Sequence, residues 1–180
     1  MSDLEIIQFP CLEDNFGVLV HDPDTGLTAA IDVPHAGTVS AALDEHGWKL
    51  SHVLATHHHI DHTGGNAEIK ERSGARIVGP AHDSQPIPGL DQAVKGGDRF
   101  AFGRFQVSVI DTPGHTRGHI IFHIPEAGVA FLGDTLFSLG CGRVIEGTMQ
   151  DMWTSLDKLR RLPAATAVYC GHEYTLANAK

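Results

Sequence analysis

Short apolar runs bounded by turn residues make up most of the chain, and their lengths are typical of strands. The segment Asp22–Gly26 contains Asp, Pro and Gly, which predicts a tight hairpin turn between two of these runs. The predicted strands are Leu4–Phe9, Phe16–His21, Leu27–Ile31, Ser51–Ala55, Arg76–Val78, Arg99–Phe102, Phe105–Ile110, His119–Ile124, Val129–Leu132 and Ala167–Cys170.

Helical periodicity is strongest in three segments. The predicted helices are Thr38–His46, Asn66–Ser73 and Met149–Leu162. In the last of these, one stripe predicts core packing, and it consists of Met149, Met152, Trp153, Leu156 and Leu159. The prolines and glycines of Pro80–Gly97 predict a long loop.

The strands fall into two groups, each followed by a helix, which predicts an α+β fold of two packed sheets with helices outside. No repeat or linker divides the chain, so we expect one domain over residues 1–180. Leu176–Lys180 resembles the start of a helix that has no end and nothing to pack against. We therefore expect a segment that belongs after residue 180 to be absent.

The composition and charge of the chain limit which kinds of molecule it can bind. Hydrophobic residues make up 42% and charged residues 19% of the chain, which is typical of a globular protein. The net charge of -9 argues against a nucleic-acid backbone or an anionic membrane as the partner. The acidic N-terminus excludes a signal peptide, and the chain lacks an apolar run long enough to span a membrane. Cys11, Cys141 and Cys170 lack any C-x-x-C spacing, which predicts reduced thiols and a cytoplasmic location.

Histidine is the exceptional residue, with 13 copies spread along the chain. Four predicted apolar strands end in a His or Asp, and loop residues at such ends can present a polar site on one edge of a sheet. The four segments at these strand ends are Thr56–His62, Asp111–His115, Gly133–Thr135 and Gly171–His172.

The segment Thr56–His62 is the densest of the four. In an extended stretch residues i and i+2 point the same way, so His57 and His59 can hold one ion while His58 points away. We expect His58 to stabilise the loop by a hydrogen bond. Asp61 and His62 follow a tight turn and can face a second ion.

The later strand ends complete two ion sites. His115 would join His57 and His59, whereas His172 would join Asp61 and His62. Asp134 is the natural bridge, because a carboxylate has one oxygen for each ion. Imidazole and carboxylate ligands favour zinc, iron or manganese over calcium. We assign the remaining histidines to the surface or the core, namely His21, His35, His46, His52, His82, His119 and His123.

A family resemblance enters through these motifs. Thr56–His62 with Gly64–Asn66 resembles the signature of the metallo-β-lactamase superfamily. Other segments resemble glyoxalase II, the hydroxyacylglutathione hydrolases, and they are Thr112–His119, Gly133–Phe137, Gly140–Arg143 with Glu146-Gly147, and Tyr169–Thr175.

The resemblance implies a four-layer αββα sandwich with two divalent metal ions at one edge. It implies hydrolysis of S-(R)-lactoylglutathione to lactate and glutathione by a metal-bridging hydroxide. The implied metal ligands are His57, His59, Asp61, His62, His115, Asp134 and His172. Asp61 and Asp134 would be catalytic, and Arg143 and Tyr174 would contact glutathione. We also consider Asp111 as a group that orients a ligand imidazole.

Two departures from the family leave alternatives open. Ile145 stands where some members have a tyrosine that helps to hold glutathione, and the family's C-terminal helical domain is missing after residue 180. The alternatives are a lactonase or another thioesterase on the same scaffold, or a truncated core with weak or no activity on glutathione thioesters. The oligomeric state is left open.

Overall fold

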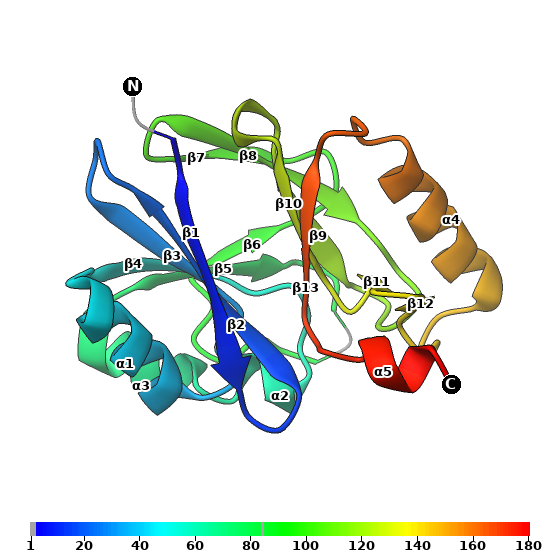
Figure 1. Ribbon diagram of the computed structural model, residues 1–180, viewed down its shortest axis with the longest axis horizontal. Helices are drawn as coiled ribbons and strands as arrows, with labels where there is room; N and C mark the ends of the chain where they lie inside the picture. Colours follow the sequence, from blue (N-terminus) through cyan, green and yellow to red (C-terminus); the bar gives the residue numbers. More distant parts are fainter. Residues whose placement is uncertain (1–2, 84) are drawn as a thin grey trace.

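The computed structural model describes residues 3–83 and 85–180. Its first sheet has six strands, which are β1 (Glu5–Cys11), β2 (Asn15–Asp22), β3 (Leu27–Ile31), β4 (Leu50–Leu54), β5 (Arg76–Pro80) and β6 (Gln92–Val94) (Figure 1). They lie side by side in chain order. The pairs from β1 to β3 are antiparallel, and the pairs from β3 to β6 are parallel.

The second sheet has the order β13-β10-β9-β8-β7. Its strands are β7 (Arg99–Phe102), β8 (Phe105–Asp111), β9 (Ile120–Ile124), β10 (Val129–Gly133) and β13 (Ala167–Cys170). Only the β10–β13 pair of this sheet is parallel. A small hairpin of β11 (Leu136–Phe137) and β12 (Gly140–Cys141) projects beside it.

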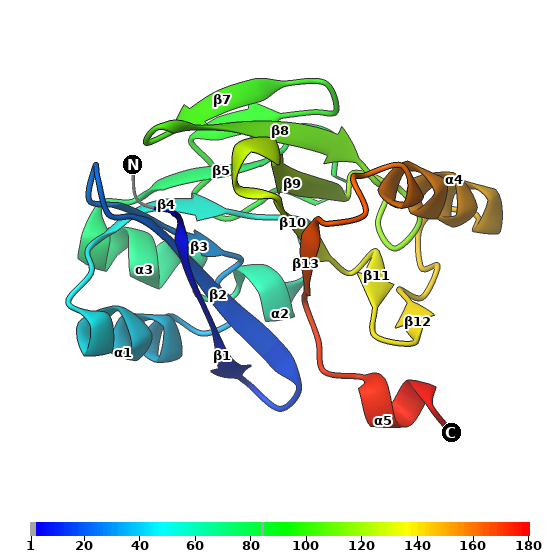
Figure 2. The same ribbon diagram turned by 45° about the horizontal axis from the view of Figure 1, so that its top comes forward.

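Helices lie between the strands along the chain and after the last described strand. They are α1 (Ala36–His46), α2 (Ile60–Thr63), α3 (Asn66–Ser73), the 3-10 turn η1 (Pro125–Ala127), α4 (Met149–Arg160) and α5 (Thr175–Asn178). Helices α1 and α3 pack on the first sheet, and α4 packs on the second (Figure 2). The expected αββα sandwich is therefore confirmed.

Alternation of side chains along the strands builds the layers. In β2, Val18 and Val20 enter the core between the sheets, whereas Leu19 points to α1 and α3. In β10, Phe131 enters the same central core, whereas Leu132 packs toward α4. Both sheets are thus covered on two faces, which fixes their edges rigidly enough to position a polar site.

Three local predictions were wrong. The predicted loop Pro80–Gly97 contains β6, a three-residue strand too short to show a period. The tight turn before His62 is the short helix α2. In α4, Met152 and Leu159 are buried as expected, but Met149 is 78% and Trp153 68% exposed, because the helix presents only part of its apolar stripe to the sheet.

Over the described ranges, none of the helices is both long and apolar enough to cross a membrane.

Candidate metal centre

Three histidines converge from two loops. The loop after β4 carries His57 and His59, whose Nε2 and Nδ1 atoms lie 3.1 Å apart. His115, from the loop between β8 and β9, places its Nε2 atom 3.0 Å from the same Nδ1 atom of His59. These residues, the first donor group, point together as the extended-chain argument predicted.

The second donor group joins the start of α2 to the loop after β13. The Nε2 atoms of His62 and His172 lie 3.1 Å apart. The Oδ2 atom of Asp61 lies 3.4 Å from His172 Nε2 and 3.7 Å from His62 Nε2. Residues that are 110 positions apart in the chain therefore meet at one point.

Asp134, at the end of β10, lies between the two donor groups. Its Oδ2 atom is 3.3 Å from His115 Nε2 and 3.4 Å from His172 Nε2. Its Oδ1 atom is 3.3 Å from His62 Nε2, is buried, and lacks a hydrogen bond within the described residues. Oδ2 thus lies close to a histidine of each group, whereas Oδ1 lies close to the second group.

The donor set fits divalent ions. Within each group, the ligand atoms lie within 4.8 Å of one another. Several ring nitrogens face each other and the Asp134 carboxylate, so protons alone leave lone pairs opposed, whereas a cation between them would satisfy all of them. The buried, unbonded oxygen of Asp134 is a further acceptor for such a cation.

The electrostatics of the two groups differ. Burial lowers the pKa of His57 well below its ordinary value, and the neighbouring His62 reinforces this. Burial also lowers the pKa of His62, but the carboxylates of Asp134 and Asp32 outweigh it and raise this pKa strongly. Burial is likewise outweighed at His172, where hydrogen bonds with Asp134 and Asp61 raise the pKa to about 10. Protons are therefore held by the second group.

Carboxylates orient the imidazoles of the second group. Asp32 Oδ2 lies 2.8 Å from His62 Nδ1, and its two oxygens also accept hydrogen bonds from the backbone and hydroxyl of Thr56. Asp14 Oδ1 lies 2.9 Å from His172 Nδ1. Sequence reasoning gave neither residue a role. Asp32 directly follows the strand Leu27–Ile31, so the strand-end signal could have found it.

Neutral oxygens orient the first group. His57 Nδ1 lies 3.0 Å from the Thr56 hydroxyl, which itself donates to Asp32. His115 Nδ1 donates to the carbonyl oxygen of Arg143 at 2.9 Å. The two groups thus share ligand types but differ in the groups behind the ligands.

His119, which we assigned to the surface or core, has a positioning contact. Its Nε2 atom accepts a hydrogen bond from the backbone N–H of Asp134 at 3.0 Å, and its Nδ1 atom lies 2.9 Å from the hydroxyl of Thr112. Burial lowers the pKa of His119 to about 3, which keeps the ring neutral and able to accept. Nothing in its spacing distinguished it from the other histidines.

His58 belongs to neither donor group, although its ring also lies close to that of His59. Its Nδ1 atom lies 3.0 Å from Asp83 Oδ2 and its Nε2 atom 3.5 Å from Glu146 Oε1. Asp83 also accepts from the backbone N–H groups of His58 and Gly118. The pair therefore ties the loop of the first group to two neighbouring loops.

The two predicted substrate contacts differ in placement. The ring of Tyr174 stacks on His172, with centroids 4.8 Å apart and an angle of 6° between the planes. Arg143 reaches the site through its backbone carbonyl, whereas its side chain is exposed.

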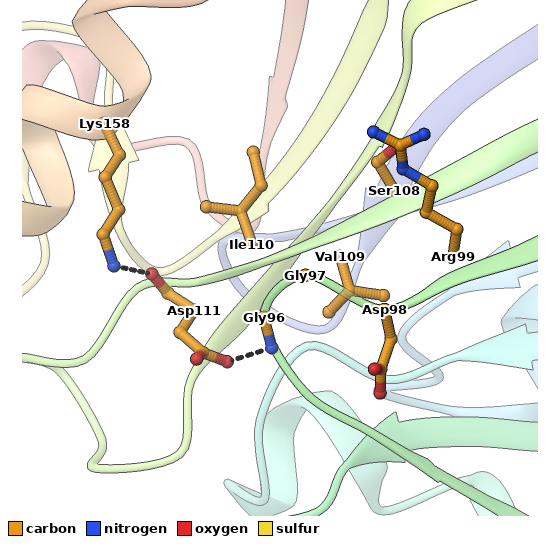
Figure 3. Close-up of a pocket in the computed structure, with 9 residues that line it drawn as sticks. All are labelled: Gly96, Gly97, Asp98, Arg99, Ser108, Val109, Ile110, Asp111 and Lys158. Atoms are coloured by element: carbon orange, nitrogen blue, oxygen red, sulfur yellow. Dashed lines mark hydrogen bonds between the residues drawn. The ribbon is translucent and has the colours of Figure 1, made fainter.

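Asp111 does not orient a ligand imidazole, so that prediction was wrong. Its Oδ1 atom accepts from the backbone N–H of Gly96 at 2.6 Å, and its carbonyl oxygen accepts from Lys158 Nζ at 2.6 Å (Figure 3). These residues line a cavity of about 390 Å³ that contains none of the predicted ligands. The position after a strand predicted the convergence of His115 correctly, but it did not predict which carboxylates lie beside the imidazoles.

Close packing at the centre requires a glycine beside the last ligand. A Cβ atom on Gly171 would lie 2.6 Å from Asp134 Oδ1 and 2.8 Å from His62 Cε1. The absence of a side chain at this position lets the β13 loop approach Asp134.

Comparisons with known proteins agree with this geometry. The family described as the metallo-beta-lactamase superfamily matches residues 22–172. Hydroxyacylglutathione hydrolases from Brucella ovis and Brucella abortus are 56% identical over 177 residues, which cover 98% of this chain and 69% of each relative. The chain belongs to the hydroxyacylglutathione hydrolase family. This membership and the His/Asp donor groups imply divalent metal ions.

Two solved structures show the same fold. ETHE1 from Myxococcus xanthus has a TM-score of 0.84 and 30% identity, and the match covers 94% of this chain and 76% of that one. TTHA1623 in a di-iron-bound form has a TM-score of 0.79 and 26% identity, with 94% and 92% covered.

Proposed function

We propose that the chain hydrolyses S-(R)-lactoylglutathione to lactate and glutathione as a metal-dependent thioester hydrolase. The observation that carries the proposal is the meeting of two His/Asp donor groups at Asp134, in a chain that is 56% identical to hydroxyacylglutathione hydrolases. The alternatives are a lactonase, another thioesterase, or a core with weak glutathione-thioester activity. Each would have the same donor groups, and a substrate assay distinguishes them.

We assign one ion to each donor group. His57, His59 and His115 would hold the first ion, Asp61, His62 and His172 the second, and Asp134 both. Zinc is our choice, with iron and manganese as the alternatives that the same ligands accept. When bound, such ions supply Lewis acidity toward the thioester carbonyl and make a water acidic enough to act near neutral pH.

The carboxylates of the chain orient the attacking water. Asp61 has a side chain that is 41% exposed, so one face of its carboxylate is open to solvent while Oδ2 faces the histidines. It can accept a hydrogen bond from a water aimed at the carbonyl carbon. Asp134 is buried, and its position between the two donor groups would fix the spacing of the two ions. Attack breaks the C–S bond, and the sulfur leaves as a thiolate, which needs no general acid.

We assign substrate binding to Arg143 and Tyr174. The exposed guanidinium of Arg143 can pair with a carboxylate of glutathione, and the Tyr174 ring next to His172 can flank the thioester. Replacing Arg143 by Ala should raise KM by about tenfold, since a charge-assisted hydrogen bond contributes about 1.5–3 kcal/mol, or about that factor at the lower end. Arg72→Ala, on the exposed face of α3, is the matched control.

The deciding experiment is hydrolysis of S-(R)-lactoylglutathione by the zinc-loaded chain, followed by the loss of thioester absorbance over a wide substrate range. Saturable turnover is the expected result. A rate that rises linearly without saturating would indicate working chemistry with a lost glutathione site. No turnover by a folded, zinc-loaded sample would overturn the proposal, and a panel of lactones and other thioesters would then identify the alternative.

The remaining assignments stay predictions. They are a single catalytic domain over residues 1–180, a cytoplasmic location, and a small-molecule partner rather than nucleic acid or membrane. The described cysteines Cys11, Cys141 and Cys170 are free thiols, which is consistent with a reducing compartment.

A further inference from the structure

The turn that joins β1 and β2 reaches the second donor group from the opposite end of the chain. Asp14, in this turn, places its Oδ1 atom 2.9 Å from Nδ1 of His172, a residue 158 positions away. A ring nitrogen this close to a carboxylate carries a proton, so when the ring holds a metal ion the other nitrogen, Nε2, is the one that offers its lone pair.

Backbone hydrogen bonds seat the turn against the loop after β13. The N–H of Phe16 donates to the carbonyl of Gly171 at 2.8 Å, and the N–H of Glu173 donates to the carbonyl of Asp14 at 2.9 Å. These bonds flank His172 on both sides, where the chain passes from β13 to α5 beside the start of β2 (Figure 1). The contact is therefore built by the fold and does not rest on one flexible side chain.

The next residue in the turn reaches a second ligand of the same group. Asn15 is buried, and its Nδ2 atom donates to the carbonyl of Asp61 at 2.9 Å. Two of the three residues of the second group, Asp61 and His172, thus depend on this one turn. The first group has no contact of this kind with the turn among the described hydrogen bonds.

The backbone of the turn is strained. Leu12 has a φ of 51°, a left-handed conformation that non-glycine residues rarely adopt. The residue is 52% exposed, so burial of its side chain does not account for the conformation. Strain of this kind persists where surrounding contacts fix the chain, and the contacts here are those with the second donor group.

We propose that Asp14 is a positioning residue that fixes the tautomer of His172 and thereby sets the affinity of the second donor group for its divalent ion. The inference rests on the proposed function in that it takes this group to be a metal site. A carboxylate behind an imidazole raises the basicity of the ligand nitrogen, whereas the carbonyl and hydroxyl oxygens behind His115 and His57 give less of this effect.

Other groups keep the His172 ring in place without Asp14. Tyr174 stacks on one face of the ring, Phe137 contacts it edge-on, and the backbone bridge to Asn15 remains. Removing the Asp14 carboxylate therefore changes the tautomer and basicity of His172 more than its position. This separates the proposed role from a structural one.

The test compares zinc binding by Asp14→Ala, Asp14→Asn and the unmodified chain, by competition with a chromophoric chelator. Asp14→Ala should weaken one of two binding steps by about 10- to 100-fold and leave the other unchanged. Asp14→Asn keeps an acceptor oxygen without the charge and should lose less. Glu13→Ala, an exposed neighbour in the same turn, is the matched control and should bind like the unmodified chain.

A double-variant cycle tests whether Asp14 acts through His172. In the His172→Ala background, Asp14→Ala should weaken zinc binding no further, whereas in the His59→Ala background its effect should persist. Chemical unfolding of the metal-free variants should show equal stability.

The results separate this inference from the proposed function. Wild-type affinity of both steps in Asp14→Ala would overturn the inference, as would equal weakening of both steps together with a loss of metal-free stability. If the unmodified chain binds two zinc ions but does not hydrolyse the thioester, the proposed function fails while the effect of Asp14 on zinc binding still stands.

Discussion

The two donor groups meet at one carboxylate but are supported by different chemistry. Behind the first group stand neutral oxygens, the hydroxyl of Thr56 and the carbonyl of Arg143. Behind the second stand the carboxylates of Asp32 and Asp14. Similar ligands thus acquire different proton and metal affinities from the residues behind them. Neither site can be understood from the ligand motif alone.

Removing the Asp134 carboxylate, which lies between the two donor groups, should have the largest effect. Asp134→Ala should lower kcat/KM for S-(R)-lactoylglutathione at least about 100-fold, because both groups lose a common ligand and a bound metal supplies several kcal/mol. Elemental analysis of zinc content alongside the rate measurement checks this. Asp44→Ala, at an exposed position of α1, is the control. A variant that kept both ions and the full rate would contradict the assignment of Asp134.

Removing one ligand from each group tests whether the groups are separable. His59→Ala should weaken only one zinc-binding step, and His172→Ala only the other, each by about 100-fold, because a lost ligand costs at least as much as a lost supporting contact. The measurement is the same chelator competition. If both variants weakened both steps equally, the centre would act as one unit and the distinction between the groups would be wrong.

A third prediction concerns the loop of the first group. The Asp83 side chain is 1% exposed and accepts from the N–H groups of His58 and Gly118. Asp83→Ala should lower the free energy of unfolding by about 2 kcal/mol, since two donors lose their acceptor. Urea unfolding of the metal-free chain measures it. A change as small as that of Asp44→Ala would show that the loop does not depend on this carboxylate.

The fourth prediction concerns the pH dependence of zinc binding. In the metal-free chain the pKa of His172 is about 10 and that of His62 is raised, so these imidazoles bind protons at pH 7, whereas the lowered pKa of His57 leaves it neutral. Zinc must displace protons from His62 and His172, but none from His57. Its affinity there should rise by about tenfold per pH unit for each proton released between pH 6 and 9, and the first step should change less.

Calorimetric titration in buffers of different ionisation enthalpy counts the protons released at each step. Release of about one proton or more at one step and none at the other is the expected result. Equal release at both steps would remove the electrostatic difference between the groups.

The sequence predicted well which side chains converge, because they follow apolar strands. The strand ends at Ala55, Leu132 and Cys170 were recognisable from composition, and the residues after them are the ones that converge. The period of two along Thr56–His62 separated His58 from its neighbours correctly. Local pattern was sufficient there because rigid strands determine where the following residues lie.

The supporting residues could not be predicted in the same way. Asp14 meets His172 through a contact between the two ends of the chain, and no local period encodes such a pairing. Asp111 was chosen for its position before His115, yet the chain turns its carboxylate toward Gly96. Likewise, the exposure of Trp153 depends on how α4 sits on its sheet, which periodicity alone does not determine.

The turn between β1 and β2 also gives the centre an order of completion during protein synthesis. The first group has all of its own ligands once residue 115 has left the ribosome, and Asp134 follows soon after. Asp14 is made 158 residues before its partner His172. Contacts of such long sequence separation form late in folding. Binding of the second ion would therefore follow the docking of the β1–β2 hairpin against β13.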